Sequence, residues 1–336
     1  MTELCVIEGD GIGHEVIPAA LQVLQRVAPD IRVRQAPGGW AWFRQHGTPL
    51  PQLTLDMAQE CRAVLFGAVA SPSWQVDNYF SPVVRLRREL QAFANLRPTR
   101  WLPVPTARKG VNMLIVRENT EDLYVGHETT EDEGQTGVAQ KVITRAASER
   151  VARLAYELAS RSGRRKVTIV HKSNVLPRSD GLFRQVALEI SEYFTGIETD
   201  ELLVDTAAYW MVKEPTRFDV VLAPNLYGDI LSDMAAAWGG GMGMAPSISM
   251  GEDVAIAEPV HGTAPDIAGR GVANPTASIL SVALLLRHHW HRPEDAQRVE
   301  EAVIKTLSEG RHTGDIYSAD ALTTRQFTDH ICARLD

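Results

Sequence analysis

Two aspartates four residues apart, Asp229 and Asp233, are the strongest local signal for chemistry in the sequence. They belong to the stretch Gly228–Asp233 (GDILSD), which follows an apolar segment and Pro224-Asn225 and is therefore expected to open a helix. This spacing places both carboxylates on one helical face, where their charges repel each other unless something neutralises them. Mg²⁺ and Mn²⁺ prefer carboxylate oxygens and would neutralise them. Considered alone, an N-cap aspartate followed by a solvated aspartate explains the pair equally well.

A lysine stands at the expected end of a strand, in the stretch Val170–Asn174 (VHKSN). The alternation of a strand puts Lys172 and Asn174 on one face and His171 on the other. Ligands bind at the carboxyl ends of strands in open α/β sheets, and a lysine there can handle a labile proton or support an enolate. The pattern indicates a candidate base, although a surface lysine is the better interpretation for this motif by itself.

Four arginines are candidates for binding an anionic substrate. Arg87 and Arg88 fall on an expected helix, Arg97 precedes Pro98, and Arg117 ends an expected strand. Guanidinium groups recognise carboxylates in bidentate fashion, and a tricarboxylate would need several of them. Adjacent helical residues point about 100° apart, so only one of Arg87 and Arg88 should face a site. For any single arginine, a solvated surface position is the simpler interpretation.

A stiff loop is expected at Glu258–Asp266 (EPVHGTAPD), because it contains two prolines and a glycine. A carboxylate such as Asp266 can accept hydrogen bonds from the ribose hydroxyls of an adenosine and would repel a 2′-phosphate, which favours NAD over NADP. Without its context, the stretch would be an unremarkable loop. The glycine turn Gly9–Gly13 is not a Rossmann fingerprint, because position 14 is His and no acidic ribose ligand is evident nearby.

Alternating strands and helices are expected to position these residues, as in an open α/β sheet. Pro82 fits the first turn of a helix that reaches residue 93. Ser148 is expected to N-cap a helix that ends at Gly163, after a polar loop or hairpin arm at 127–137. The glycine-rich stretch 239–243 is a natural crossing point between domains. Strands are expected at 4–8, 31–34, 63–67, 112–117, 140–144, 167–171, 198–204 and 219–222, and helices at about 15–27, 180–193, 206–212 and 229–237.

Composition narrows the class of protein. The chain has 336 residues, 44% of them hydrophobic and 23% charged, and a formal net charge of -8 with both signs interspersed, which argues against a nucleic-acid or membrane-surface binder. Its three cysteines form neither a CxxC pair nor a disulfide framework, and we expect them to be free thiols in a reducing cytosol. The start of the chain lacks signal-peptide architecture, and the longest apolar run, 279–286, is too short to span a bilayer and indicates a buried helix. We expect a cytoplasmic protein that binds no nucleic acid and no membrane.

Taken together, these segments resemble the β-decarboxylating dehydrogenase family, which includes isocitrate, 3-isopropylmalate, homoisocitrate and tartrate dehydrogenases. The resemblance runs along nearly the whole chain, through Glu8–Gly13 (EGDGIG), Asn225–Asp229 (NLYGD) and Ala273–Thr276 (ANPT). It implies an α/β, two-domain isocitrate/isopropylmalate dehydrogenase-like fold around a shared twisted sheet, not a Rossmann fold. A discontinuous NAD-binding domain would comprise residues 1–98 and 241–336, and a dimerisation and metal/substrate domain would comprise residues 99–240.

The resemblance also implies a role for each candidate residue, in a homodimer or tetramer whose subunits share active sites. Lys172 and Asp205 would act across the interface and accept the hydroxyl proton, and Tyr124, in Asp122–Gly126 (DLYVG), would be the general acid. Mg²⁺ or Mn²⁺ would be held by Asp205, Asp229 and Asp233. The substrate would be bound by Ser71, Val84, Arg87, Arg97, Arg117 and Asn174. NAD would be bound by Ile12, Glu258, His261, Gly262, Ala264, Asp266 and Asn274.

The implied reaction is the NAD-linked, metal-dependent oxidative decarboxylation of a small tricarboxylic hydroxy acid. Homoisocitrate, converted to 2-oxoadipate in lysine biosynthesis, ranks first and isocitrate second. Ser81–Arg88 (SPVVRLRR) is similar to the fungal-type homoisocitrate pattern, and Arg117–Glu121 (RENTE) matches the isocitrate and homoisocitrate branches. Isopropylmalate enzymes usually place two leucines where Val83 and Val84 stand, and two valines would also admit an apolar group.

3-Isopropylmalate, used in leucine biosynthesis, is therefore the main alternative substrate. Two alternatives of other classes are weaker. A non-catalytic regulatory subunit of NAD-isocitrate dehydrogenase would be expected to lose the tyrosine, the lysine or a metal aspartate, and all are present. A phosphate-binding module would need a Walker lysine, which the glycine turn lacks at the expected offset.

Overall fold

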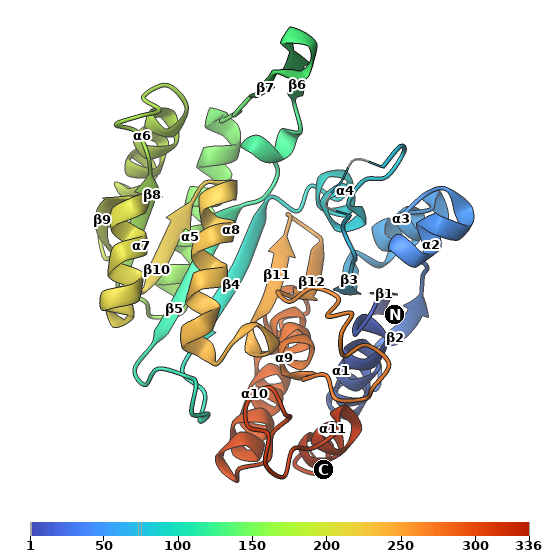
Figure 1. Ribbon diagram of the computed structural model, residues 1–336. Helices are drawn as coiled ribbons and strands as arrows, with labels where there is room; N and C mark the ends of the chain where they lie inside the picture. Colours follow the sequence, from blue (N-terminus) through green and yellow to red (C-terminus); the bar gives the residue numbers. More distant parts are fainter. Residues whose placement is uncertain (1, 73, 75, 336) are drawn as a thin grey trace. The chain divides into compact units, whose positions relative to one another are not determined.

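The computed structural model describes residues 2–72, 74 and 76–335. The chain forms two compact units (Figure 1), each described here by itself. Unit 1 comprises Met1–Ala92, Trp101–Lys109 and Ala236–Asp336, and unit 2 comprises Phe93–Arg100 and Gly110–Ala235. These bounds differ from the boundaries expected at 98/99 and 240/241. Strand β4 (Ala94–Arg100) pairs along its whole length with β5 (Asn112–Glu118), so the entire strand belongs to unit 2.

The sheet of unit 1 has the strand order β2-β1-β3-β12-β11. The first four of these strands are parallel, and β11 is antiparallel to β12. Strand β3 reads AVLFGA and is buried at every position, the continuous apolar run typical of a parallel strand covered on both faces. The bounds are β1 Glu3–Gly9, β2 Arg32–Gln35, β3 Ala63–Ala68, β11 Pro246–Met250 and β12 Ala255–Pro259.

Helices pack on the unit 1 sheet through apolar faces. Helix α1 (Gly13–Val27) buries Val16, Ala20, Val23 and Val27 at helical spacing and packs against α9, α10 and α11. Helix α9 is buried along its whole length and continues into a π-helical turn, as expected for the apolar run at 279–286. The remaining bounds are α2 Trp40–His46, α3 Gln52–Cys61, α4 Pro82–Glu89, η4 Ala237–Gly239, η5 Met242–Met244, α9 Thr276–Leu284, η6 Leu285–His289, α10 Pro293–Ser308 and α11 Thr324–Cys332.

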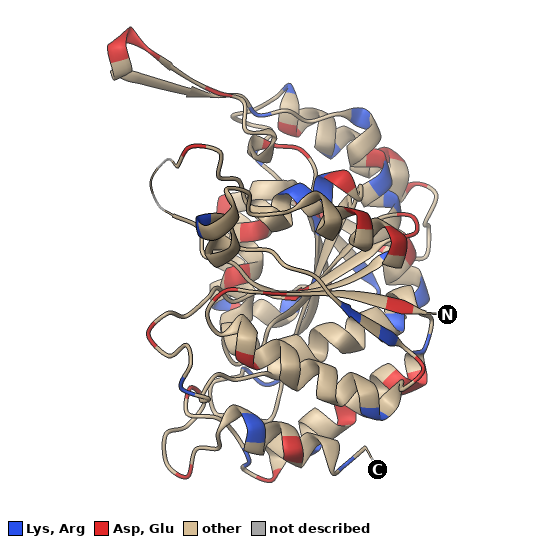
Figure 2. Cartoon of the chain, turned by 90° about the vertical axis from the view of Figure 1, so that its right-hand side faces the viewer, with Lys and Arg blue, Asp and Glu red and all other residues tan. Residues whose placement is uncertain are grey.

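The sheet of unit 2 has the order β4-β5-β10-β8-β9, parallel except for the antiparallel β4. Helix α5 packs against α6 and lies over β5, β8 and β10, while α7 contacts β8 and β9. A hairpin formed by β6 and β7 projects from this unit, and Figure 2 shows acidic residues at its tip. The bounds are η1 Leu123–Val125, β6 Glu128–Glu131, η2 Asp132–Gly134, β7 Thr136–Ala139, α5 Arg145–Arg161, β8 Lys166–His171, α6 Ser179–Ser191, β9 Glu198–Leu203, α7 Val204–Lys213, η3 Pro215–Arg217, β10 Val220–Ala223 and α8 Asn225–Ala236.

Most expected elements of unit 2 are present, but some details were wrong. Residues 140–144 do not form a strand: only an isolated bridge joins Val142 to Asp122. Ser148 is not the N-cap of α5, because the Thr144 hydroxyl accepts a hydrogen bond from the Ala147 N–H and the helix begins at Arg145. The Ser148 hydroxyl is instead buried and donates to the Thr144 carbonyl.

Two of the remaining expectations concern the chain as a whole. Cys5, Cys61 and Cys332 are buried thiols without disulfide bonds. Within the described residues, no helix is both long enough and apolar enough to cross a membrane.

Candidate active site

The two aspartates of α8 converge on a single arginine in unit 2. Nη1 of Arg97 lies 2.8 Å from Oδ1 of Asp233, and its Nη2 lies 3.1 Å from Oδ1 of Asp229. The i, i+4 spacing therefore brings both carboxylates to one side of the helix, as expected. Arg97 is itself fixed by two further hydrogen bonds, from Nε to Asn95 and from Nη1 to the Ser232 hydroxyl, each 2.8 Å.

A second arginine, Arg117 on β5, contacts Asp229 from the interior of unit 2. It is 1% exposed, forms an ion pair with Asp229, and donates from Nε and Nη2 to Oδ1 of Asn225 at 2.9 and 2.6 Å. The helix comes this close because residue 228 is glycine: a Cβ there would lie 2.7 Å from Cβ and Cγ of Arg117. Sequence reasoning gave Asn225 no role of its own, although a polar residue directly after an apolar strand was a usable signal.

Tyr124 completes this cluster from the short helix η1. Its hydroxyl donates to Oδ2 of Asp229 at 2.6 Å, and the Arg117 guanidinium lies 5.0 Å from the centroid of its ring. Burial raises the pKa of the Tyr124 phenol, the Arg117 charge opposes that shift, and the hydrogen bond to Asp229 adds to it. The phenol therefore keeps its proton at neutral pH.

The carboxylates of α8 suit a hard divalent cation. Burial raises the pKa of Asp233, the charge of Arg97 counteracts this, and the neighbouring Asp229 adds to the rise. Two partly buried carboxylates that destabilise each other's ionised form are a donor set that Mg²⁺ or Mn²⁺ would stabilise. Within the described residues of one chain, however, no group of three or more His, Cys, Asp or Glu side chains is placed to hold a metal ion. Asp205 therefore does not join Asp229 and Asp233 within one chain.

Lys172 and Asp205 form a separate ion pair in unit 2. The hydrogen bond from Lys172 holds the pKa of Asp205 below its usual value. The expected alternation around Lys172 was wrong, because β8 ends at His171 and the next four residues form a turn closed by Val175 N–H to Lys172 O, 3.0 Å. Asn174 is exposed in this turn, while His171 is buried in the strand.

Two of the segments expected to bind NAD adjoin each other in unit 1. The Ile12 N–H donates to the Thr263 carbonyl at 3.0 Å, which joins the glycine turn to the loop after β12. A Cβ on Gly11, whose φ is +57°, would lie 2.3 Å from the same carbonyl oxygen, so the close approach requires glycine. Ile12 is 5% exposed at this junction.

The loop after β12 carries polar groups that fit a bound ligand. Within the described residues, Nε2 of His261 is buried without a hydrogen-bond partner, and burial lowers the pKa of this imidazole. Gly262 and Asp266 are exposed, and Ala264 has a φ of +40°, which is unusual for a residue with a side chain. A neutral imidazole, an open glycine and an accessible carboxylate are suitable groups for a dinucleotide. The side chain of Asn274 already has a partner within the protein, because its Nδ2 donates to Asp315 at 3.0 Å.

Arg87 and Glu258, expected to bind substrate and NAD respectively, bind each other in unit 1. Nη2 of Arg87 lies 2.6 Å from Oε1 of Glu258, and the two residues are 7% and 8% exposed. Within the described part of the chain, Nε of Arg87 is buried and has no hydrogen-bond partner, so a donor remains for an anion. Arg88 is exposed, in agreement with the expectation that only one of the two faces inward.

Two expected substrate contacts in unit 1 lie near the surface. Ser71 is exposed in the segment after β3, and Val84 is half-buried on α4. Val84 precedes Arg87 by one helical turn and shares its face. The neighbouring Val83 packs instead against the hydrophobic core of the unit.

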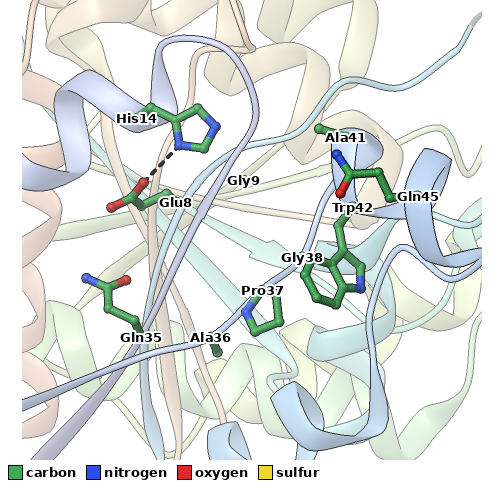
Figure 3. A pocket seen from close by; sticks show the side chains of 10 residues that line it. All are labelled: Glu8, Gly9, His14, Gln35, Ala36, Pro37, Gly38, Ala41, Trp42 and Gln45. Carbon is green, nitrogen blue, oxygen red and sulfur yellow. Dashed lines mark hydrogen bonds and ion pairs between the residues drawn. The ribbon is translucent and has the colours of Figure 1, made fainter.

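A pocket of about 530 Å³ lies elsewhere in unit 1, beside the carboxyl ends of β1 and β2 (Figure 3). His14 pairs there with Glu8 at 2.8 Å, and Trp42 and Gln45 of α2 face them across the pocket. None of the residues expected to take part in catalysis or binding lines it. Its lining consists of Glu8, Gly9, His14, Gln35, Ala36, Pro37, Gly38, Ala41, Trp42 and Gln45.

The chain belongs to the isocitrate/isopropylmalate dehydrogenase family, whose sequence profile matches residues 3–331. It is 45% identical over 332 residues to the isocitrate/homoisocitrate dehydrogenase of Thermus thermophilus, covering 99% of this chain and 98% of that one. It is 44% identical to the 3-isopropylmalate dehydrogenase of Archaeoglobus fulgidus, covering 100% of both chains. The solved structure of isocitrate dehydrogenase from Methylococcus capsulatus matches with a TM-score of 0.96 at 39% identity, covering 100% of this chain and 99% of that one. The expected α/β fold of this family is thereby confirmed. Enzymes of the family are oxidative decarboxylating dehydrogenases that act on small hydroxy acids.

Proposed function

We propose that this protein catalyses the NAD-dependent oxidative decarboxylation of homoisocitrate to 2-oxoadipate, with isocitrate as a second substrate. The observation that carries the proposal is the unit 2 cluster in which Arg97, Arg117 and Tyr124 all contact the carboxylate of Asp229, and Arg97 also contacts Asp233. It would combine anion recognition, a proton donor and carboxylates for a divalent cation in one place. The reaction belongs to lysine biosynthesis, and we place the enzyme in the cytoplasm.

Each residue of the cluster then has a task in the reaction. Arg97 and Arg117 bind substrate carboxylates, a role for which planar guanidinium groups are suited. Lys172, acting as the neutral amine and through Asp205 or water, accepts the proton of the C2 hydroxyl, and Tyr124 protonates the enol carbon after CO₂ departs. The raised pKa of Tyr124 supports this role, because the acid must be protonated when it is needed.

The ligand groups divide between the two units. Asp229 and Asp233 would hold Mg²⁺ or Mn²⁺, and His261, Gly262 and Asp266 would hold NAD. When bound, NAD supplies the hydride acceptor and the metal supplies the Lewis acid that polarises the C2 oxygen and stabilises the enolate. Arg97 and Arg117 form ion pairs with these aspartates.

We propose a homodimer or tetramer in which Lys172 and Asp205 serve the active site of a neighbouring subunit. The supporting observation is that Asp205 does not join Asp229 and Asp233 within one chain. The ion pair of Lys172 with Asp205 would then act as a preformed unit presented to the neighbour.

The choice of substrate rests on similarity more than on contacts. Glu118 and Glu121, in the stretch Arg117–Glu121, use their carboxylates inside the protein: Glu118 accepts from Thr120, and Glu121 accepts from Thr144. They stabilise the segment between β5 and Tyr124. The high identity to an isocitrate/homoisocitrate dehydrogenase supports homoisocitrate.

3-Isopropylmalate is the second candidate. The similarity to a 3-isopropylmalate dehydrogenase is nearly as high, and the half-buried Val84 on the face of Arg87 would accept an apolar substituent. A regulatory, non-catalytic subunit is disfavoured because the tyrosine, the lysine and the aspartates are all retained.

The test is NADH formation with Mg²⁺, comparing kcat/KM for homoisocitrate, isocitrate and 3-isopropylmalate, with NADP as a cofactor control. The proposal expects homoisocitrate to have the highest value and NADP to support little turnover. A higher kcat/KM for 3-isopropylmalate would move the enzyme to leucine biosynthesis. No turnover of any of the three would favour the regulatory-subunit alternative.

A further inference from the structure

A buried lysine that no step of the proposed reaction uses lies behind the cluster in unit 2. Lys141 follows the β6–β7 hairpin, and its side chain is 12% exposed. Its Nζ lies 2.6 Å from Oδ1 of Asp180 and 3.6 Å from Oδ1 of Asp122, both of which are 0% exposed. The ammonium also lies 4.2 Å from the ring centroid of Tyr227. One positive charge therefore compensates two fully buried carboxylates.

The lysine is charged in this environment. Burial lowers the pKa of Lys141, but the bond to Asp180 and the charge of Asp122 outweigh burial and hold the pKa above its usual value. Without the ammonium, two carboxylates would lie in the interior without a counter-charge, so they would take up protons or draw in water. Either change would alter the hydrogen bonds that Asp122 and Asp180 accept from the backbone.

One of these carboxylates fixes the backbone of the candidate base. Oδ2 of Asp180 accepts a hydrogen bond from the backbone N–H of Lys172 at 2.6 Å. This bond sets the point at which the chain leaves β8 and turns. The position of the Lys172 side chain therefore depends on the position of Asp180.

The other carboxylate fixes the two segments that carry Tyr124 and the aspartates of α8. Oδ1 of Asp122 accepts from the Leu123 N–H at 2.8 Å and caps η1, on which Tyr124 lies. Its Oδ2 accepts from the Leu226 N–H at 3.0 Å, in the first turn of α8. Asp122 has a φ of +73°, a strained conformation that the paired backbone of Val142, beside Lys141, holds in place.

We propose that Lys141 is a positioning residue for the reaction: through Asp122 its ammonium holds Tyr124 and helix α8 in place, and through Asp180 it holds Lys172, which serves the neighbouring subunit. The inference rests on the proposed function for the meaning of those residues. A displacement of about 1 Å in a reacting group can cost on the order of 10²-fold in rate. A lysine outside the reacting atoms can therefore affect kcat strongly.

Three variants test this. Lys141→Met removes the charge at similar length, and Lys141→Arg keeps it. Lys166→Met is the matched control, because Lys166 lies at the other end of β8, is 19% exposed and pairs with Asp200 at 3.1 Å. We expect Lys141→Met to lower kcat about 10- to 100-fold while KM and NAD affinity change less than about threefold, with Lys141→Arg restoring part of the loss. Lys166→Met should keep wild-type kcat.

Amide hydrogen exchange supplies a readout that needs no activity. The backbone N–H groups of Leu123, Lys172 and Leu226 should exchange faster in Lys141→Met, and at the wild-type rate in Lys166→Met. A general loss of stability would instead speed exchange over the whole unit in both variants. Should Lys141→Met fail to fold, Lys141→Gln, which can still donate to Asp180, carries the same comparison.

Two results would overturn the inference: wild-type kcat with unchanged exchange at the three amides in the charge-removing variant, or an equal loss of kcat in Lys166→Met. Failure of the proposed function looks different. In that case the wild-type protein would turn over none of the hydroxy acids, while the exchange experiment would still report whether Lys141 holds the three amides.

Discussion

The hydroxyl of Tyr124 donates a hydrogen bond to Oδ2 of Asp229, 2.6 Å away. The proposed proton donor and a proposed metal ligand are therefore in direct contact. The other carboxylate oxygen, Oδ1, is bound by both Arg97 and Arg117. Asp229 thus contacts all three groups, so a change in its charge is expected to alter its interactions with the Tyr124 phenol and with both guanidinium groups.

Tyr124→Phe is expected to lower kcat by about 10²- to 10⁴-fold, the range for loss of a positioned general acid. NAD affinity should be unchanged, because the residues proposed to bind NAD lie in unit 1. Steady-state kinetics and a fluorescence titration with NADH measure the two quantities. Wild-type turnover by this variant would remove Tyr124 from the mechanism.

Asp233→Asn is expected to weaken Mn²⁺ binding at least about tenfold, the loss seen even for outer-shell partners of a metal. Electron paramagnetic resonance of free Mn²⁺ measures this without turnover. Because burial raises the pKa of Asp233, the wild-type affinity should begin to fall at a higher pH than for an ordinary aspartate as the solution is acidified. The control is Asp200→Asn, which removes a surface partner of Lys166 in the same unit. Equal affinities in both variants would argue against a metal at α8.

Val84→Leu is expected to shift preference toward 3-isopropylmalate, because an added methylene group on the face of Arg87 narrows the space for a carboxylate arm. One methylene in an apolar pocket changes discrimination by about 10- to 200-fold at most. The ratio of kcat/KM values for the two substrates measures the shift. The matched change Val83→Leu alters a residue that packs into the core instead. An unchanged ratio in Val84→Leu would show that this position does not face the substrate.

Glu121→Gln is expected to change how stability depends on pH. Burial raises the pKa of Glu121 to about 7, against an ordinary value of 4.5. Between these values the folded protein holds a proton that the unfolded chain has lost, so the wild-type protein loses stability as the pH rises through this window. The glutamine can still accept from the Thr144 N–H and can donate to the Thr144 hydroxyl, and it does not titrate. The melting temperature of Glu121→Gln minus that of the wild-type protein should therefore be a few degrees greater at pH 8 than at pH 5. Parallel melting curves at both pH values would show that Glu121 does not titrate there.

Sequence patterns predicted much of the cluster in unit 2. The spacing of Asp229 and Asp233 placed both on one side of a helix, where Arg97 pairs with both. The pattern failed at Lys172, because the period-two rule assumes that a strand continues. The chain turns after His171, where Asp180 accepts the next backbone N–H, and no local pattern reveals that bond.

Contacts between distant segments were outside the reach of sequence reasoning. Lys141 lies before α5, and Asp180 lies in α6, which follows β8. Only the folded chain brings the two side chains together. The start of α5 was misplaced for a different reason. Thr144 and Ser148 are both good capping residues, and the choice between them depends on the burial of Ser148, which is a tertiary property.

The path of the chain through its two units has a consequence for synthesis on the ribosome. Unit 2 is made from one nearly continuous stretch, whereas strand β3 of unit 1 pairs on one side with β12, which is translated much later. At about 5–20 residues per second, an interval on the order of ten to forty seconds separates the two strands. During that interval β3 presents an unpaired, wholly apolar edge, a surface prone to pair with other chains. The nascent protein is therefore expected to need a chaperone until its last third emerges, and unit 2 should acquire protease resistance first.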